Sequence, residues 1–327
     1  MKAVIITRWG GPEVLEIQER PKPEPGVGQI RVRVRASALN RADLMQREGN
    51  YPVPPGVSAD ISGMEYAGEV DAFGPAATLW KTRDRVMGII AGAGHAEYVC
   101  VHEREAMAVP KALSWEDAAA IPEAFLTAYD ALFNRLALRT GETVLIHAVG
   151  SGVGTAALQI ARVAGATVVG TARSTEKLER AKQLGLDFGI DAARGEWASL
   201  VEAAIGVERV HAVLDLVGGN YLDENLRVLA LRGRIVVVGL TAGASAPFNM
   251  GTLLRKRLTV VGTTLRARPL EEKIALAREL SERIIPLFDT GRLKPIVDRV
   301  FPFSEIRAAH ELMHSNKTFG KIVLTWD

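Results

Sequence analysis

The stretch from Ala148 to Gly154 is a glycine-rich turn whose residue types suit the binding of a pyrophosphate. The apolar run from Thr143 to His147 predicts a buried strand before the turn, and apolar residues at helical spacing predict a helix after it. Glycines let the backbone approach a pyrophosphate closely, and the N–H groups at a helix start receive it. The stretch therefore predicts a dinucleotide-binding site.

The turn departs from the strict G-x-G-x-x-G pattern of dinucleotide sites. When the pattern is aligned to end at Gly154, Val149 and Ser151 stand at its first two glycine positions. Two other glycines supply the flexibility instead, and the Ser151 hydroxyl is able to donate to a phosphate. A tight strand-to-helix turn without a ligand is the alternative interpretation. The candidate cofactor-binding residues are Gly150, Ser151, Gly152, Val153 and Gly154.

The residues after the next predicted strand bear on which dinucleotide binds. A cofactor with a free ribose 2′-hydroxyl usually meets an Asp or Glu about 20 residues beyond the turn. No carboxylate stands at this strand end, and Arg173, Ser174 and Lys177 follow it, placed to surround a 2′-phosphate. The pattern favours NADPH. The alternative is that Arg173 and Lys177 are ordinary solvated charges on a helix.

The chain has two regions of different sequence pattern, and these indicate the elements that position these residues. Up to about Ile121, short strands with frequent Pro and Gly predict a barrel-like β domain. From about Ala124, β-branched strands alternate with helices, which is typical of a parallel sheet covered on both faces. A long helix is predicted over 270–288, and strands over 297–301 and 322–325 are expected to return to the first domain, leaving a cleft between the two.

Composition and charge exclude several classes of protein. The 327 residues favour two domains, and a formal charge of +2 gives no argument for a nucleic-acid or anionic-membrane partner. No segment approaches the roughly 20 apolar residues of a membrane span. A single cysteine, Cys100, rules out an internal disulfide and points to a reducing compartment. We expect a cytoplasmic protein without a nucleic-acid or membrane partner.

Several blocks of sequence, in order along the chain, resemble a known family. They include ALNRADLMQREGNYPVPPG, ISGMEYAGEV and EAFLTAYDAL, followed by HAVGSGVGTAALQIAR, LDLVGGNYLDENL and SNKTFGKIVL. The chain resembles the zeta-crystallin-like quinone oxidoreductases of the medium-chain dehydrogenase/reductase superfamily, and within them the p53-inducible quinone oxidoreductase type. The resemblance runs nearly end to end.

The resemblance implies an α/β fold with a GroES-like, β-rich catalytic domain and a Rossmann domain built on a doubly wound parallel sheet. We place the catalytic domain at residues 1–122 and 267–327, and the NADPH-binding domain at residues 123–266. The family also implies a homodimer or homotetramer. An edge strand such as Leu258 to Leu265 is a candidate for extending the sheet across a dimer.

Further site residues are implied by the resemblance alone. Asn40 and Tyr51 fall where the family lines the nicotinamide and substrate cleft, and Asn40 also counts as a cofactor contact. One departure is Ala192, where many bacterial members carry a tyrosine near the 2′-phosphate, so phosphate recognition must rest on the residues after the second strand. The remaining implied cofactor contacts are Thr127, Val217, Gly218, Gly239, Leu240, Leu265, Asn316 and Lys317.

The ligands of zinc-dependent relatives are missing from this chain. Asn40 stands in place of their catalytic cysteine, and Gly63-Met64-Glu65 stands in place of their Gly-His-Glu. One cysteine cannot form their four-cysteine lobe. The stretch His310 to His314 matches the H-E-x-x-H motif of metalloproteases, but we interpret these residues as the surface of a C-terminal helix. No metal is expected.

The chemistry that fits these residues is hydride transfer from NADPH to a quinone, in which orientation of two rings contributes most. Reduction of α,β-unsaturated carbonyls is the close alternative, and a non-catalytic structural or RNA-binding role is a third. Tyr51 is the candidate for hydrogen-bonding the acceptor oxygen. The alternative is that its side chain only packs within its loop. Asn40 either orients the acceptor or caps the local turn, and Asp43 is expected to pair with a cation. The sequence shows no proton relay, so water is a candidate acid.

Overall fold

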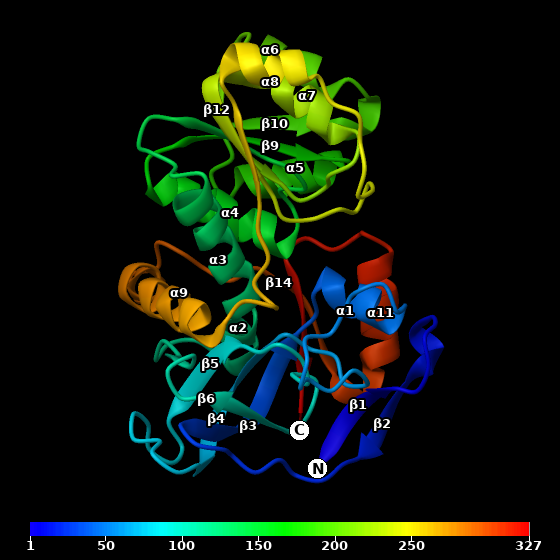
Figure 1. The fold of residues 1–327 in the computed structure, drawn as a ribbon, viewed down its shortest axis with the longest axis vertical. Helices are drawn as coiled ribbons and strands as arrows, with labels where there is room; N and C mark the ends of the chain where they lie inside the picture. Colours follow the sequence, from blue (N-terminus) through cyan, green and yellow to red (C-terminus); the bar gives the residue numbers. More distant parts are fainter. Residues whose placement is uncertain (327) are drawn as a thin grey trace. The chain divides into compact units, whose positions relative to one another are not determined.

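The computed structural model describes residues 1–326, apart from the side chain of Arg194, and the chain divides into two units. Unit 1 comprises Met1–Leu126 and Leu265–Asp327, and unit 2 comprises Thr127–Thr264. The chain therefore leaves unit 1 and comes back to it (Figure 1). Among the described residues, no helix has the length and apolar character needed to span a membrane.

Unit 2 is built on a six-stranded parallel sheet with the order β10-β9-β8-β11-β12-β13. The chain starts in the middle of the sheet, builds one half to its edge, and then returns to build the other half, which is the doubly wound arrangement. The strands are β8 (Thr143–Ile146), β9 (Thr167–Ala172), β10 (Phe188–Asp191), β11 (Val210–Asp215), β12 (Leu229–Val237) and β13 (Thr259–Gly262).

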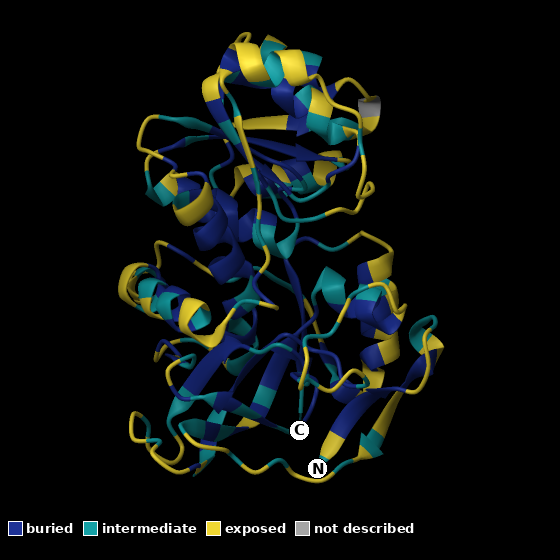
Figure 2. Ribbon diagram, in the orientation of Figure 1, coloured by how far each residue is buried: buried dark blue, intermediate teal, exposed yellow. Residues whose placement is uncertain are grey.

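The helices of unit 2 are α4 (Gly152–Val163), α5 (Thr175–Lys182), α6 (Trp197–Ile205), α7 (Tyr221–Val228) and α8 (Met250–Lys256). The central strands are buried on both faces because every residue from Val144 to Ile146 is apolar and fully enclosed. Figure 2 shows this sheet as a dark band of buried residues between helices with exposed outer faces. The predicted parallel sheet is confirmed.

Unit 1 contains a seven-stranded sheet with the order β14-β15-β3-β4-β5-β7, in which β6 also pairs with β3, and a separate pair β1-β2. C-terminal β15 pairs antiparallel with β3, so the end of the chain completes the first sheet. The strands are β1 (Lys2–Ile6), β2 (Leu15–Glu19), β3 (Gln29–Ala38), β4 (Glu65–Phe73), β5 (Arg85–Ile89), β6 (Tyr98–His102), β7 (Met107–Ala108), β14 (Val297–Pro302) and β15 (Lys321–Thr325).

The helices of unit 1 differ in one place from the sequence prediction. Residues 270–288 form two helices rather than one, with the break at Ile284. Pro286 explains the break, because it has no N–H to bond the carbonyl one turn earlier. The helices are α1 (Arg41–Arg47), α2 (Trp115–Ala119), α9 (Leu270–Arg283), α10 (Ile285–Asp289) and α11 (Ile306–His314), with α3 (Pro122–Tyr129) at the boundary between the units.

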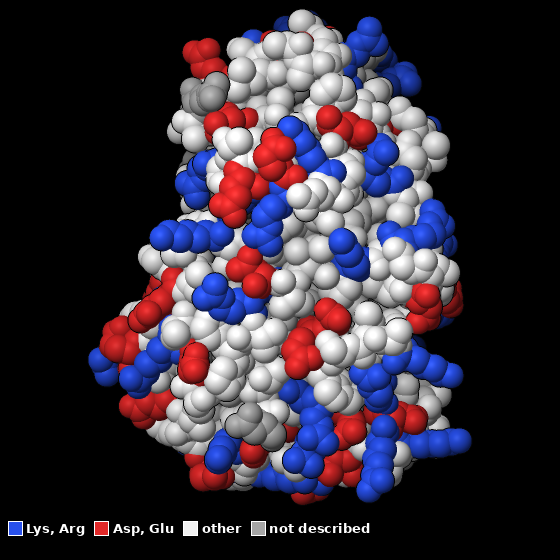
Figure 3. Space-filling model, turned by 180° about the vertical axis from the view of Figure 1, so that it is seen from behind, with Lys and Arg blue, Asp and Glu red and all other residues white. Residues whose placement is uncertain are grey.

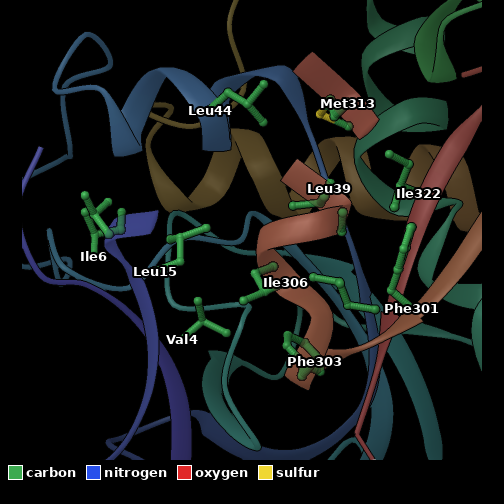
Figure 4. Close-up of a cluster of buried hydrophobic side chains, with 13 residues drawn as sticks. Val4, Ile6, Leu15, Leu39, Leu44, Phe301, Phe303, Ile306, Met313 and Ile322 are labelled. Atoms are coloured by element: carbon green, nitrogen blue, oxygen red, sulfur yellow. The ribbon is translucent and has the colours of Figure 1, made fainter. Parts of the chain in front are cut away.

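A hydrophobic cluster joins α1 and α11 to the strands at both ends of the chain (Figure 4). Leu39, just before α1, and Leu44 on α1 are buried in it, and Ile322 is buried in it from β15. These apolar side chains flank two polar residues, Asn40 and Lys321, that meet in the candidate site. Packing of the cluster therefore sets where those polar groups lie.

The H-E-x-x-H stretch is not the surface feature that the sequence suggested. His310 is fully buried in α11, and its Nδ1 lies 3.2 Å from Nη1 of Arg47, while His314 is exposed. His314 is the last residue of α11, so one histidine lies in the core and the other in solvent at the helix end. Across residues 1–326, no cluster of three or more His, Cys, Asp or Glu could hold a metal ion.

Charges of both signs are interspersed over the surface. On the face that Figure 3 shows, Lys and Arg side chains alternate with Asp and Glu, and the described residues form no extended basic stripe there. This distribution agrees with the formal charge of +2.

The buried histidines make the stability of unit 1 sensitive to acid. Burial lowers the pKa of both His95 and His310, and the Nε2 atom of each is buried without a partner among the described residues. Both rings are therefore neutral in the folded state, and stability falls as the pH drops below their ordinary pKa of 6.5. We expect His310→Gln to reduce this loss between about pH 7 and pH 5.

Thermal unfolding across that pH range measures the effect, and each kcal/mol corresponds to about 2–4 °C in midpoint. His314→Gln on the same helix is the control, since its ring is exposed. Parallel pH dependences for the wild type and His310→Gln would contradict the explanation.

Candidate active site

The glycine-rich turn has the geometry of a helix start with close backbone packing. Ser151 is the N-cap of α4, and its Oγ accepts a hydrogen bond of 3.0 Å from the N–H of Gly154. A Cβ on Gly154 would lie 2.4 Å from the carbonyl oxygen of Ala148, so no other residue fits there without a backbone shift. Ala148 itself has a left-handed φ of 47°. The turn is strained and tightly packed, as a dinucleotide turn requires.

The first N–H groups of α4 point to an anion-binding role. Gly152 and Val153 occupy the first two helical positions, where an N–H has no carbonyl one turn earlier to bond. The helix has 12 residues, so its dipole adds to the attraction for a phosphate. Because the hydrogen of the Ser151 hydroxyl is not used in capping, that group can still donate to the same anion.

The three residues proposed to recognise the 2′-phosphate lie where β9 ends and α5 begins. Arg173 is exposed, and no carboxylate among residues 1–326 pairs with it. Ser174 is the N-cap of α5 and accepts a hydrogen bond from the N–H of Lys177. The β9 strand end carries no acidic residue, and the first acid beyond it, Glu176, lies in the first turn of the helix.

Asp215 organises the loop that follows β11. Its Oδ1 accepts hydrogen bonds from the N–H groups of Val217 (2.8 Å) and Gly218 (2.9 Å). Gly218 has φ 68°, and a Cβ there would lie 2.8 Å from Leu240 and 3.1 Å from the carbonyl oxygen of Gly239. Four of the residues implied to border the nicotinamide are thus brought together at the carboxyl ends of β11 and β12.

A buried chain of hydrogen bonds supports this edge of the sheet. Oδ2 of Asp215 accepts from the amide of Asn225 (3.1 Å), so the Asn225 oxygen must accept from Nε2 of His147 (2.7 Å). Nδ1 of His147 then accepts from the Thr171 hydroxyl at 2.9 Å. Burial lowers the pKa of His147, in keeping with a neutral ring that donates on one side and accepts on the other. The chain links the ends of β8, β9 and β11.

The remaining implied cofactor contacts lie at separate places in the fold. Thr127 is buried in α3 at the start of unit 2, and Leu265 is buried at the return to unit 1. Asn316 and Lys317 are exposed in the loop between α11 and β15, where Asn316 has φ 58°.

In unit 1, Asn40 belongs to a buried ionic network. The Lys321 ammonium donates to Oδ1 of Asn40 (2.6 Å), to Oε1 of Glu65 (2.7 Å) and to the carbonyl of Leu39 (2.9 Å). The Asn40 amide donates to the same Glu65 oxygen at 2.8 Å. Glu65 is completely buried, and its second oxygen accepts from the N–H of Glu123 at 2.9 Å.

Asp43 does not pair with a cation through a hydrogen bond, contrary to the sequence expectation. One of its oxygens accepts from the N–H of Asn40 (2.7 Å) and the other from the N–H of Gly63 (2.9 Å). The side chain thereby caps α1 and anchors the loop that precedes β4. The Asn40 side chain bonds Lys321 and Glu65 of the ionic network.

The residues at the zinc position of zinc-dependent relatives do not suit zinc. Asn40 and Glu65 offer oxygens, and Met64 offers only a thioether. Both oxygens that could face a metal are engaged by the Lys321 ammonium. A cation already fills the place where a second one would have to bind, so we derive no step that involves zinc.

Tyr51 lies against a buried guanidinium. Arg266 stacks over the Tyr51 ring at 5.1 Å from the centroid. The same guanidinium donates to Oε1 of Gln46 (2.7 Å) and to the carbonyl of Ala91 (2.6 Å). Because Gln46 lies on α1, Arg266 links the Tyr51 loop to the helix that begins at Asn40.

Comparison with known proteins identifies the family. The alcohol dehydrogenase GroES-like domain matches residues 26–111, and the zinc-binding dehydrogenase domain matches residues 152–282. The synaptic vesicle membrane protein VAT-1 homolog of Mus musculus is 33% identical over 99% of this chain and 83% of its own length. The chain belongs to the medium-chain dehydrogenase/reductase family. The quinone oxidoreductase of Homo sapiens is 29% identical over 99% of this chain and 97% of its own length.

Solved structures of the family share the whole fold. An Escherichia coli quinone oxidoreductase complexed with NADPH has a TM-score of 0.89 at 29% identity, covering 99% of this chain and 100% of its own. An NAD-dependent alcohol dehydrogenase has a TM-score of 0.86 at 33% identity, covering 99% of each chain. The CurK enoyl reductase has a TM-score of 0.87 at 29% identity, covering 100% of this chain and 99% of its own.

These matches confirm the resemblance to quinone oxidoreductases and the two-domain fold; the p53-inducible type stays a prediction. Sequence reasoning had not singled out Lys321, Glu123 or Arg266 as parts of the site. For Lys321, the available signal was a charged residue directly before the apolar run Ile322-Val323-Leu324. Neither of the other two has a local signal, because their partners lie far away in the sequence.

Gly154 provides a test of the turn. We expect Gly154→Val to weaken NADPH binding by at least about tenfold and to lower the unfolding midpoint, because its side chain would overlap the backbone of Ala148. Fluorescence titration with NADPH and thermal unfolding are the measurements. Gly262→Ala in the same unit is the control, since a Cβ there meets nothing within 4 Å. Unchanged NADPH affinity in Gly154→Val would rule the turn out as the binding site.

Proposed function

We propose that this protein is an NADPH-dependent, zinc-independent reductase that transfers a hydride to a quinone. The observation that carries the proposal is the combination of a dinucleotide turn with an ammonium ion at the zinc position. The first supplies a site for a nicotinamide cofactor. The second leaves no open metal coordination to stabilise an alkoxide, so an already activated acceptor is the better substrate.

The residues of unit 2 fit NADPH. The α4 start and the Ser151 hydroxyl suit the pyrophosphate, and Arg173 with Ser174 and Lys177 suits the 2′-phosphate. Gly218 and Gly239 let the backbone after β11 and β12 pack closely, because a Cβ at either position would overlap neighbouring protein atoms. The bound cofactor would supply a hydride. The related E. coli structure in complex with NADPH supports the same assignment.

In unit 1, Asn40 and Tyr51 would orient the acceptor. The Asn40 amide is held by Glu65 and Lys321, so it presents a fixed dipole rather than a freely rotating one. Tyr51 is held by the Arg266 guanidinium, which favours an oriented phenol hydroxyl. Holding two rings in a reactive geometry is the main contribution that such side chains make to hydride transfer.

A second candidate function is reduction of α,β-unsaturated carbonyls. The structural likeness to the CurK enoyl reductase favours it, and an enone accepts a hydride into a conjugated system as a quinone does. The same residues would serve both reactions, and the loop that carries Tyr51 would decide between the acceptors.

We also propose that the protein acts in the cytoplasm as a homodimer or homotetramer. The half-buried thiol of Cys100, the single cysteine, supports a reducing compartment. The β13 strand is the edge of its sheet and exposes Val260, which supports pairing of two sheets across a symmetric interface.

The choice of cofactor is testable by charge removal. We expect Arg173→Ala with Lys177→Ala to raise the Kd of NADPH by about 100-fold or more, since two charge-assisted hydrogen bonds contribute about 1.5–3 kcal/mol each. The Kd of NADH should change little. Isothermal titration with both cofactors is the measurement, and Lys182→Ala, at the other end of α5, is the control. An equal loss for both cofactors would show that these cations do not read the 2′-phosphate.

The acceptor is testable with matched panels of quinones and enones. We expect NADPH oxidation with higher kcat/KM for quinones, and rates unaffected by a zinc chelator because no step requires a metal. Turnover of enones alone would replace the first function by the second. Tight NADPH binding without oxidation by any acceptor would favour a non-catalytic role.

A further inference from the structure

Glu123 is the one acidic side chain of the Asn40 network whose carboxyl is not used in the structure. It lies in the first turn of α3, and its N–H donates to Glu65. Its side chain is half-buried and has no hydrogen-bond partner among residues 1–326. The carboxyl is therefore open to a group that the protein itself does not supply.

Neither neighbouring cation donates a hydrogen bond to the Glu123 carboxyl among residues 1–326. An ammonium has three N–H donors, and those of Lys321 go to Leu39, Asn40 and Glu65. Arg266 donates to Gln46 and Ala91 and stacks on Tyr51. Glu65 and Asp43 add negative charge on the other side. Glu123 thus faces two carboxylates, and both nearby cations are bonded to other groups.

These surroundings favour the protonated carboxyl. Burial, together with the charge of Glu65, raises the pKa of Glu123 to about 8, and Asp43 acts in the same direction. The charges of Lys321 and Arg266 oppose the rise and are too weakly placed to cancel it. A carboxylic acid that is neutral at physiological pH can donate a hydrogen bond and a proton, as general acids do.

Reduction of a quinone by hydride leaves an oxygen that such a group can protonate. The C–H bond of the reduced nicotinamide breaks, a bond to the acceptor forms with both electrons, and an oxyanion of the acceptor remains. The nicotinamide is oxidised and the quinone is reduced by two electrons. One proton is still needed to form the hydroquinone.

We propose that Glu123 is the proton donor of this reaction and that it protonates the acceptor oxygen. The inference rests on the proposed function, in which Asn40 lines the acceptor site. The O–H bond of Glu123 breaks, the proton bonds to the acceptor oxygen, and the carboxylate left behind takes a proton from water before the next turnover. Glu65 is a positioning residue, because it holds the backbone of Glu123 and repels its anionic form.

The test compares Glu123→Gln with Glu123→Asp. Glutamine keeps the shape of the side chain and the N–H bond to Glu65 but has no acidic proton. For the wild type, kcat/KM with a quinone should fall as the pH rises through about 8, because the donor is lost on ionisation. Glu123→Gln should lose on the order of 10²-fold in kcat/KM below that pH and should no longer show the alkaline fall. Glu123→Asp should retain the fall.

The matched control is Glu105→Gln. Burial raises the pKa of Glu105 as well, but this residue lies between β6 and β7, outside the Asn40 network. Its variant should keep the rate and the pH profile of the wild type. Infrared spectroscopy of the cofactor-free protein gives a readout besides activity. A C=O band of a protonated carboxyl that disappears with a pKa of about 8 should be present in the wild type and in Glu105→Gln, and absent in Glu123→Gln.

The possible failures are distinguishable. If the wild type oxidises NADPH with a quinone and Glu123→Gln has the same rate and pH profile, the donor role is wrong and the proposed function stands. The same holds if the infrared band remains in Glu123→Gln. If the wild type reduces no acceptor, the proposed function is wrong, and the donor role falls with it.

Discussion

The buried Lys321 ammonium is the interaction on which the site in unit 1 depends. It bonds a backbone carbonyl at Leu39, an amide at Asn40 and a carboxylate at Glu65, so it joins the last strand to two segments near the start of the chain. Pairing two buried charges contributes little net stability, but removing one partner costs about 3–5 kcal/mol. The ammonium therefore specifies which arrangement forms more than it stabilises that arrangement. An apolar substitute would pack as well and would leave Asn40 free to turn away.

Unit 2 positions its loops with a directed chain of hydrogen bonds. From Thr171 to Asp215, a hydroxyl, an imidazole, an amide and a carboxylate donate and accept in one direction. The chain ends at two backbone N–H groups of the loop after β11, where the negative charge of Asp215 is satisfied. A cofactor with several negative charges binds to the same sheet edge by the proposed function. Because two backbone N–H groups bond the Asp215 carboxylate, its negative charge repels that cofactor less.

The sequence predicted much of the fold, because periodic burial is a local property. The β-branched strands and the turn from Ala148 to Gly154 predict the parallel sheet. The lack of an acidic residue directly after β9 indicates a ribose that carries a phosphate. Prediction was weaker where burial depends on distant partners. His310 reads as a surface residue until Arg47, far away in the sequence, is placed beside it. Glu123 likewise reads as an ordinary first-turn acid, whereas its chemistry comes from Glu65.

Exchanging a metal for an ammonium also changes which reactions the scaffold can favour. A bound zinc stabilises an alkoxide by direct coordination, and that is what makes an alcohol a practical hydride donor. All three N–H donors of the Lys321 ammonium bond protein groups, so none is left to stabilise a charge that develops on a substrate. It bonds the Glu65 carboxylate instead, and the charge of Glu65 disfavours a second charge at Glu123. The Lys321 ammonium thus influences a substrate indirectly, through Glu65 and the proton that Glu123 retains. A site of this kind favours hydride acceptors, such as quinones and enones, whose oxygen becomes basic on reduction.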